Sequence, residues 1–412
     1  MTTMENQPFR SLERDELLAA VKSVEGLIDG AAQAAEEQRD LSAATVTAMS
    51  EAGLLKYASP RIVGGYEVDP ISSAEISEAI ARVDLCAAWL AVQQSTAASI
   101  FSRVVSDAAF STVFGDGRLP ILSGSIGPLA GAFRAVDGGY LVNGRWSFLS
   151  AVRNAQWVTV SGTLADPASG PTHPIGAIIP KSAIVIEDNW YVAGMKASGS
   201  YDISAKQVFV PTDMTYAHKL PPTRMRDVEG RRGFPPHMNA VAMALGATQR
   251  VIDELVKQSL AKVRPGAKEA VAHRPYFQHF LGESQIRLRS ARAGFYEIIT
   301  EMWRLEREEE AFPFELTAQL VASPAFVFSL ACDIATQALR FMGSNAARLE
   351  NPLQRFHRDL TVMSLHVQNG EQYYETFGQL LLGLDVIVPG GSNMIGNRAK
   401  IETENRPSAI PA

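Results

Sequence analysis

An aromatic ring and a hydroxyl stand close together in the chain at a predicted strand-to-loop corner. Phe148 and Ser150 belong to the segment Trp-Ser-Phe-Leu-Ser and come just before the polar pair Arg153-Asn154. Together the two side chains suit a flat polar ligand, because one can pack on a ring face while the other bonds a ring heteroatom. The local sequence by itself favours a simpler interpretation, in which Phe148 is a core residue and Ser150 a turn residue.

A histidine in the C-terminal region is the second side chain that could do chemistry. His366 lies on a predicted helical stripe, at steps of three or four residues, with Asp359, Met363, Gly370, Tyr373 and Phe377. An imidazole that titrates near neutral pH can donate or accept a proton. Because the stripe is largely apolar, the pattern alone favours a core histidine.

A β-hairpin is the element expected to position the aromatic ring and the hydroxyl. Asn143-Gly144 separates Tyr140-Leu141-Val142 from Arg145-Trp146-Ser147-Phe148. Asn-Gly between alternating apolar residues is a strong signal for a hairpin turn, since both turn residues need positive φ. The sequence therefore predicts a turn at Asn143-Gly144.

The middle of the chain alternates between apolar and polar residues, as strands do. The candidate strands are Ile121 to Ser125, Arg134 to Val136, Tyr140 to Phe148, Trp157 to Gly162, Ile175 to Pro180, Val185 to Trp190 and Lys206 to Val210. Short strands at this spacing predict a small barrel or sandwich.

Helical periodicity dominates on both sides of this region. The N-terminal helices are predicted from Leu12, from Leu41 to Ala52 with a cap at Gly53, and as two helices within Ser72 to Phe110. The C-terminal helices are predicted at Asn239 to Val263, His279 to Glu310, Phe314 to Phe341 and Leu353 to Leu384, which describes an antiparallel four-helix bundle. The expected domains are 1–120 (helical), 121–213 (β), 214–238 (linker), 239–395 (bundle) and 396–412 (tail).

Composition excludes several classes of protein. A chain of 412 residues is too long for one compact core, and its net charge of -6 argues against a nucleic-acid partner. Cys86 and Cys332 lie in apolar helical patterns, which favours reduced thiols in a cytoplasmic protein. The first residues, Met1 to Arg14, contain no apolar signal region, and the apolar window Leu320 to Cys332 is too short to span a bilayer, so no membrane partner is expected.

Three groups of motifs follow one another along nearly the whole chain. The first is Gly53-Leu54-Leu55, Pro60 and Gly64-Gly65-Tyr66; the second is Trp190, Gly194-Met195-Lys196, Gly199-Ser200-Tyr201-Asp202 and Val208-Phe209-Val210-Pro211. The third is Gln337, Phe341-Met342-Gly343-Ser344-Asn345, Pro352-Leu353 and Arg358-Asp359. This ordered set resembles the acyl-CoA dehydrogenase superfamily. The resemblance implies a mainly α fold with a central β domain, in the order helical bundle, small β domain, four-helix bundle.

One departure from the dehydrogenase pattern points to a particular branch. The dehydrogenases commonly carry a catalytic Glu-Gly-Thr shortly after the Arg-Asp pair, but Arg358-Asp359 is followed by Leu-Thr-Val-Met-Ser-Leu and His366. The alternative glutamate position, around Pro236 to Ala240, holds no acid. With this histidine and Trp146-Ser147-Phe148-Leu149-Ser150, the chain resembles the two-component monooxygenases, such as 4-hydroxyphenylacetate hydroxylase and the dibenzothiophene monooxygenases.

The resemblance implies the oxygenase component of a two-component flavin-dependent monooxygenase. Such a component takes reduced FMN or FAD from a separate NAD(P)H:flavin reductase and reacts with O2 through a C4a-(hydro)peroxide. It hydroxylates an aromatic or polyketide-like substrate, or oxidises sulfur or nitrogen. The sequence holds no Gly-x-Gly-x-x-Gly fingerprint and no P-loop, which supports this division of labour. A homo-oligomer, with a tetramer favoured, is also implied.

The same resemblance assigns roles to individual residues. His366 and Ser150 are the catalytic candidates, and Trp89, Gln93 and Tyr373 are the substrate-binding candidates. Cofactor contacts are expected from Ser123, Ser125, Trp146, Phe148, Ser150, Arg274, Gln278, Gly343 and Ser344. No metal site is expected, since the other histidines lack ligand spacing with acids.

Two other functions are compatible with the sequence. One is an acyl-CoA dehydrogenase whose base has moved to Glu371 or Glu375. The other is a non-catalytic paralogue that keeps the fold as an oligomeric scaffold.

Overall fold

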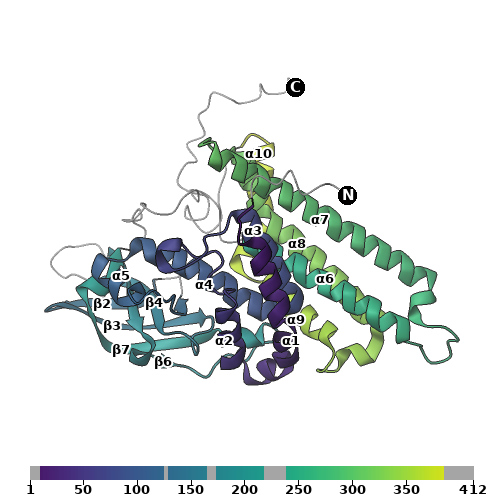
Figure 1. Cartoon of the computed structure of the whole chain (residues 1–412), viewed down its shortest axis with the longest axis horizontal. Helices are drawn as coiled ribbons and strands as arrows, with labels where there is room; N and C mark the ends of the chain where they lie inside the picture. Colours follow the sequence, from purple (N-terminus) through teal and green to yellow (C-terminus); the bar gives the residue numbers. More distant parts are fainter. Residues whose placement is uncertain (1–9, 125–128, 165–172, 218–237, 385–412) are drawn as a thin grey trace. The chain divides into compact units, whose positions relative to one another are not determined.

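Two compact units make up the chain. The computed structural model describes residues 10–124, 129–164, 173–217 and 238–384. Its contacts divide into the units Met1–Glu229 and Gly230–Ala412, and each unit is described by itself (Figure 1).

The first unit begins with helices that have clear capping residues. Ser42, Asp69, Asp84 and Ser106 each accept a backbone N–H at a helix N-terminus, as N-cap residues do. Gly53 follows the second helix at φ +75°, which confirms the predicted cap. The helices are α1 (Arg14–Gln38), α2 (Ala43–Glu51), α3 (Pro70–Val83), α4 (Leu85–Val104) and α5 (Asp107–Phe114).

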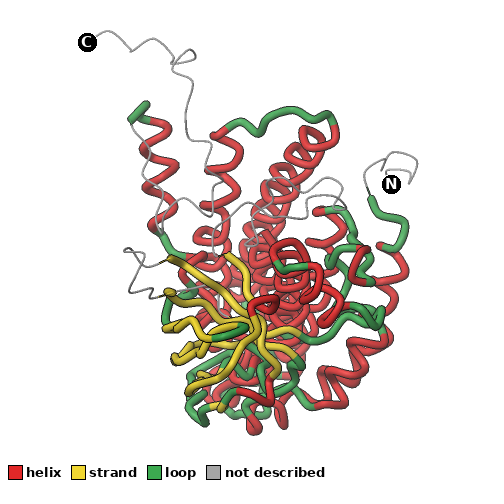
Figure 2. The backbone as a smooth tube through the Cα atoms, turned by 90° about the vertical axis from the view of Figure 1, so that its left-hand side faces the viewer, coloured by secondary structure: helices red, strands yellow, loops and turns green. Residues whose placement is uncertain are grey.

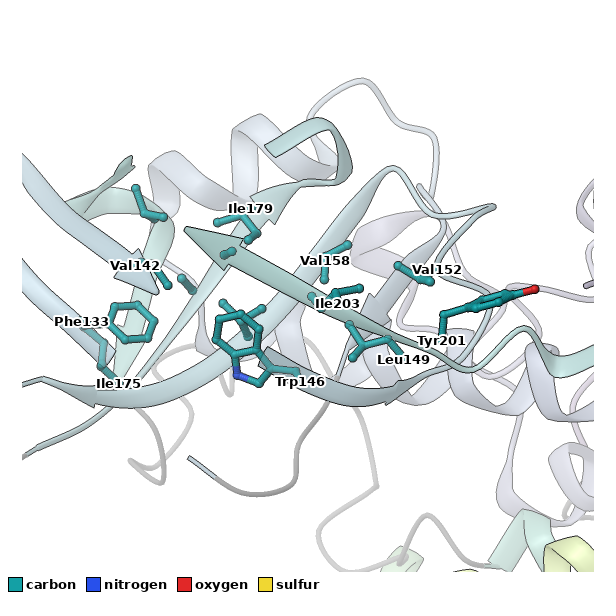
Figure 3. Close-up of a cluster of buried hydrophobic side chains, with 14 of the residues drawn as sticks. Phe133, Val142, Trp146, Leu149, Val152, Val158, Ile175, Ile179, Tyr201 and Ile203 are labelled. Atoms are coloured by element: carbon teal, nitrogen blue, oxygen red, sulfur yellow. The ribbon is translucent and has the colours of Figure 1, made fainter. Parts of the chain in front are cut away.

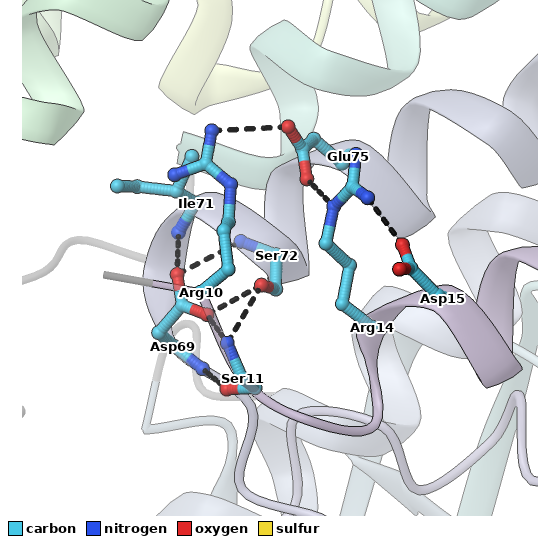
Figure 4. Close-up of polar contacts among 8 residues, drawn as sticks. All are labelled: Arg10, Ser11, Arg14, Asp15, Asp69, Ile71, Ser72 and Glu75. Atoms are coloured by element: carbon cyan, nitrogen blue, oxygen red, sulfur yellow. Dashed lines mark hydrogen bonds and ion pairs between the residues drawn. The ribbon is translucent and has the colours of Figure 1, made fainter. Parts of the chain in front are cut away.

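The start of α1 is tied to α3 by polar contacts (Figure 4). The carboxylate of Asp69 accepts the backbone N–H of Ser72 at 2.9 Å and that of Ser11 at 2.7 Å. Arg14 of α1 also pairs with Glu75 of α3. One carboxylate therefore caps α3 and anchors the segment that leads into α1.

A mixed sheet follows the helices, and its strands gather in one region of this unit (Figure 2). Its order is β6-β7-β3-β2-β4-β5-β8, with β1 paired to β4; the β1–β4 and β2–β4 pairs are parallel and the others antiparallel. The strands are β1 (Leu122–Gly124), β2 (Gly131–Val136), β3 (Gly139–Leu149), β4 (Trp157–Leu164), β5 (His173–Pro180), β6 (Val185–Ile186), β7 (Tyr201–Pro211) and β8 (Thr215–Ala217). Strand β8 lies within the residues expected to form the linker.

The hairpin turn is not where the sequence predicts it. Val136 pairs with Gly139, so the turn between β2 and β3 is Asp137-Gly138, with Gly138 at φ +75°. Asn143-Gly144 lies inside β3 instead, at a shift of register against β7. There Asn143 Oδ1 accepts the backbone N–H of Gln207 at 2.9 Å. The predicted Asn-Gly turn is therefore wrong. Asn143 instead accepts a backbone N–H that a bulge in β7 leaves without a partner in the strand ladder.

The sheet encloses one apolar core and shares another with helices. Trp146, Phe133 and Tyr201 belong to a cluster built from strand and loop residues (Figure 3). On the other side, Phe101 of α4 and Phe114 of α5 pack with residues of β1 and β5. Residues of β5 thus pack in both clusters, Ile175, Ala177 and Ile179 in the first and Ile178 in the second, which anchors this side of the sheet to α4 and α5.

The second unit is a helical bundle around α8. The helices are α6 (Met238–Ala261), α7 (Pro275–Arg307), α8 (Phe314–Met342), α9 (Pro352–Ser364) and α10 (Gln372–Leu381). Helix α8 contacts the other four. The predicted bundle is confirmed, except that its fourth helix, expected from Leu353 to Leu384, is divided into α9 and α10 by a 3₁₀ turn at Val367–Asn369.

Helix α8 is longer than its apolar window suggested. By length and composition, the segment Phe314–Ala347 is the one candidate membrane span among the described residues, which corrects the expectation that the region is too short. Of its most apolar window, 67% is buried inside the structure. We interpret α8 as the core helix of the bundle.

Candidate active site

Strand β3 ends in a bulged corner that places an aromatic ring at the surface. The register against β7 shifts between Trp146 and Leu149, so that two residues of β3 face a single residue of β7. Such a β-bulge re-aims a side chain. Phe148 has φ +64° and is 71% exposed, and its ring lies edge-on to Trp190 with 6.0 Å between centroids. The core interpretation that the local sequence favours for Phe148 is therefore wrong, and the ring is available to a ligand, as the predicted cofactor contact requires.

The backbone on both sides of Ser150 is strained. Phe148 and Ala151 both have positive φ, at +64° and +55°, although neither is glycine. Such conformations cost on the order of 1–3 kcal/mol each and persist where the surrounding structure fixes them, often at ligand sites. The strain agrees with a functional corner better than with a plain turn.

The hydroxyl of Ser150 is held by groups from two other segments. The indole N–H of Trp89, on α4, donates to Ser150 Oγ at 2.9 Å. Ser200 Oγ lies 2.8 Å from Ser150 Oγ, and Ser198 Oγ lies 2.8 Å from Ser200 Oγ. Ser150 thus belongs to a chain of hydroxyls that we call the serine chain: Ser150, Ser200 and Ser198.

Ser123 positions the corner through its side chain. It is buried, and its hydroxyl donates to the carbonyl of Ser150 at 2.7 Å. On the other side, the N–H of Ala151 donates to the carbonyl of Ser198 at 2.9 Å. The Ser123 hydroxyl hydrogen is therefore committed to the protein, and Ser125, the neighbouring cofactor candidate, lies outside the described residues.

Helix α4 is fixed to this corner by the buried side-chain amide of Gln94. Gln94 donates to the carbonyl of Pro120 at 2.7 Å and accepts the N–H of Leu122 at 2.9 Å. Gln93, the predicted substrate contact, is half-buried beside it. The amide of Gln94 thus aligns α4, and with it Trp89, against β1.

Trp146 has almost no surface for a ligand. It is 1% exposed in the core cluster, and its indole N–H donates to the carbonyl of Ser161 at 2.7 Å (Figure 3). We interpret Trp146 as a core residue and not as the predicted cofactor contact.

In the second unit, His366 lies at the corner between α9 and α10. Its backbone is extended, with φ -64° and ψ 136°, so the predicted helical stripe through His366 is wrong. Its Nδ1 accepts the backbone N–H of Gln368 at 3.3 Å, which requires an unprotonated Nδ1 and leaves the neutral ring's proton on Nε2. Burial lowers the pKa of His366, so the imidazole is mainly neutral at neutral pH.

Asn369 supports the His366 corner and is not among the residues predicted from the sequence. It is 3% exposed; its N–H donates to the carbonyl of His366 and its Nδ2 to the carbonyl of Met363, both at 2.8 Å. These bonds satisfy groups that the end of α9 leaves open. The residue pattern Asn-Gly at 369–370 was the only available signal, as a helix breaker.

Tyr373 belongs to the core of the bundle. It is 1% exposed, packs with Val321 and Ala322 of α8, and burial raises the pKa of its phenol. We interpret it as structural. The alternative bases Glu371 and Glu375 are both exposed, which does not suit a general base in a dry site.

The remaining cofactor candidates gather at one end of the second unit. Tyr276 and Phe277 of α7 pack on Phe341 of α8, with ring centroids 5.5 and 5.2 Å apart. This contact brings the start of α7, which holds Arg274 and Gln278, to the end of α8, which is followed by Gly343 and Ser344. A further cation lies there, because Arg264 donates to the carbonyl of Phe341 at 3.0 Å.

No metal centre accompanies these sites in the part of the chain that the structure describes. No group of three or more His, Cys, Asp or Glu there could hold an ion. Neither Cys86 nor Cys332 forms a disulfide.

Comparison with known proteins places the chain in a family. The acyl-CoA dehydrogenase N-terminal domain matches residues 14–109, and the acyl-CoA dehydrogenase C-terminal domain matches residues 238–371. The chain belongs to the acyl-CoA dehydrogenase superfamily. The predicted fold class is thereby confirmed.

Relatives over almost the full length define the branch. HsaA, the oxygenase subunit of a flavin-dependent monooxygenase from Mycobacterium tuberculosis, is 28% identical over 422 residues, covering 96% of this chain and 100% of the relative. The indole-3-acetate monooxygenase of Pseudomonas putida is 26% identical over 375 residues, covering 89% and 95%. The structure of XiaF from Streptomyces, in complex with FADH2 and glycerol, has a TM-score of 0.82 at 22% identity, covering 91% and 97%. The chain is therefore a flavin-dependent monooxygenase of this superfamily.

Proposed function

We propose that this chain is the oxygenase component of a two-component system and that its substrate is aromatic. The corner at the end of β3 carries the proposal, because it combines an exposed ring at Phe148 with the fixed hydroxyl of Ser150. These groups suit a flavin ring, which has a flat apolar face and polar ring atoms. The relative named for indole-3-acetate supports an aromatic substrate.

The candidate residues have separate roles in this proposal. Phe148 packs on the flavin ring and Ser150 donates a hydrogen bond to it. His366, neutral and with its proton on Nε2, exchanges a proton with the substrate. Reduced flavin supplies two electrons, so that one oxygen atom of O2 enters the substrate and the other leaves as water.

A second group of residues is proposed to bind the phosphate end of the flavin. Arg274, Gln278, Gly343 and Ser344 bind the phosphate end of FMN or FAD, where the start of α7 meets the end of α8. A separate NAD(P)H:flavin reductase supplies the reduced flavin. We further propose that the protein is a cytoplasmic homotetramer.

One experiment tests the proposed reaction. The full chain is mixed with chemically reduced FAD or FMN, isotopically labelled O2 and indole as an aromatic probe, with indole-3-acetate and simple phenols as further probes. The expected result is an oxygenated product that carries the label. Tight binding of oxidised FAD that is bleached by an acyl-CoA, without any labelled product, would instead establish the dehydrogenase alternative.

A further inference from the structure

The serine chain can order its hydrogens in two ways. A hydroxyl donates one hydrogen and accepts two, whereas the indole N–H of Trp89 can only donate. Trp89 therefore always fills one acceptor position of Ser150 Oγ. What remains on Ser150 is one acceptor position and one hydrogen.

The direction of the hydrogen bonds in the serine chain decides whether Ser150 can donate to a ligand. If Ser150 donates to Ser200 and Ser200 to Ser198, the hydrogen of Ser150 is used inside the protein. If the order reverses, Ser200 and Trp89 fill both acceptor positions, and the hydrogen of Ser150 is left to point outward. Only the reversed order makes Ser150 a pure donor.

The rest of the corner leaves little else free to move. The carbonyl of Ser150 is bonded by Ser123, and the next N–H along the chain, that of Ala151, is bonded to the carbonyl of Ser198. Ser198 and Ser200 are themselves buried. With the backbone fixed, rotation of hydroxyl hydrogens is the remaining adjustment, and it needs no displacement of heavy atoms.

We infer that Trp89 is a positioning residue which, with Ser200 and Ser198, makes Ser150 a hydrogen-bond donor toward the flavin. This inference rests on the proposed function and changes the expected role of Trp89, which was that of a substrate contact. The arrangement is preorganised, so an acceptor on the ring meets a donor whose oxygen is already satisfied.

A double-mutant cycle tests whether Trp89 acts through Ser150. The proteins are the wild type, Trp89→Phe, Ser150→Ala and the double variant, with Trp157→Phe as the matched control because Trp157 is a half-buried indole of β4. Two quantities are measured without any substrate: the anaerobic dissociation constant for reduced FAD, and the rate of hydrogen peroxide release after O2 is added. Circular dichroism checks that each variant is folded.

The inference predicts a strongly non-additive cycle. Ser150→Ala weakens reduced-flavin binding and speeds peroxide release by about fivefold, the effect of one lost hydrogen bond. Trp89→Phe alone changes both quantities in the same direction, and in the Ser150→Ala background it changes neither. Trp157→Phe matches the wild type. Equal effects of Trp89→Phe in both backgrounds would overturn the inference, since Trp89 would then act on the ligand directly.

A second pair of variants keeps the test decisive if Trp89→Phe does not fold. Ser200→Ala removes the next link of the serine chain and should reproduce the faster peroxide release, whereas Ser200→Thr keeps the hydroxyl and should restore the wild-type rate. If both variants release peroxide at the wild-type rate, the serine chain does not orient the hydroxyl of Ser150. If the wild type itself fails to bind reduced flavin, the proposed function fails and not this inference alone.

Discussion

Gly199 and Asp40 are in such close contact that a Cβ on Gly199 would lie 2.7 Å from Asp40 Oδ1. Gly199 has φ +53° and stands between Ser198 and Ser200 in the sequence. Asp40, in the connection from α1 to α2, also accepts the side-chain N–H of Asn154 at 3.1 Å. The carboxylate therefore packs closely against the segment that carries two members of the serine chain.

Gly199→Ala should be more destabilising than an ordinary glycine substitution. The new methyl adds a clash to an unfavourable backbone conformation, and we expect a loss of about 2–4 kcal/mol in the free energy of unfolding. Gly117→Ala is the control, because Gly117 has φ +74° but open space around a Cβ, and should cost about 1 kcal/mol. Urea unfolding measures the free energy of unfolding of both variants. Equal losses in the two variants would contradict the close contact between Gly199 and Asp40.

Asp40→Asn should change how stability depends on pH. Burial raises the pKa of Asp40 from 3.8 to about 6, against the opposing effects of Arg153, Lys181, the Leu41 N–H and Asn154. Between these values the folded chain holds a proton that the unfolded chain has lost. Wild-type stability should therefore fall as pH rises through this window and stay level above it.

The isosteric amide removes this titration and keeps an acceptor for Asn154. Relative to the wild type, Asp40→Asn should gain roughly 2 kcal/mol in free energy of unfolding between pH 4 and pH 6. Urea unfolding at several pH values measures the difference. If the free energy of unfolding depends on pH in the same way in both proteins, Asp40 has the same pKa in the folded and unfolded states, contrary to the prediction.

Phe148→Ala should separate ligand binding from stability. The ring is 71% exposed and contacts the ring of Trp190 edge-on, so its removal should cost less than about 1 kcal/mol of stability. Loss of a ring that packs on the flavin should weaken reduced-FAD binding about fivefold to tenfold. Phe209→Ala, which removes an exposed ring from β7 (52% exposed), is the control and should leave binding unchanged. Unaltered affinity in Phe148→Ala would remove this residue from the site.

His366 can be tested with a pair of variants that separate capping from proton exchange. Asparagine can accept the N–H of Gln368 in place of Nδ1 but cannot exchange a proton, whereas alanine does neither. We expect His366→Asn to keep the wild-type stability and His366→Ala to lose about 1 kcal/mol, with product formation abolished in both. The measurements are thermal unfolding and labelled product yield. Normal turnover in His366→Asn would confine His366 to a structural role.

The order of the helices and strands, and the family, could be predicted from the residue pattern alone. Apolar spacing located α6 and α8 to within two residues, because a helix that packs on one face must repeat with its own period. The ordered motifs, together with the histidine that follows Arg358-Asp359, identified the flavin monooxygenase branch. These signals are local or linear, so they can be read without knowledge of any contact.

Which residues of the site are exposed to a ligand, and which bonds hold them, depends on contacts that form only in the folded protein. The turn lies at Asp137-Gly138 and not at Asn143-Gly144. Asn143 is instead part of β3, where its side chain accepts the backbone N–H of Gln207 at a bulge in β7. Phe148 is exposed through another bulge, while Trp146, two residues earlier, is buried. The bond from Trp89 to Ser150 joins residues 61 positions apart. Such bonds depend on how distant segments pack, and no local pattern in the sequence specifies them.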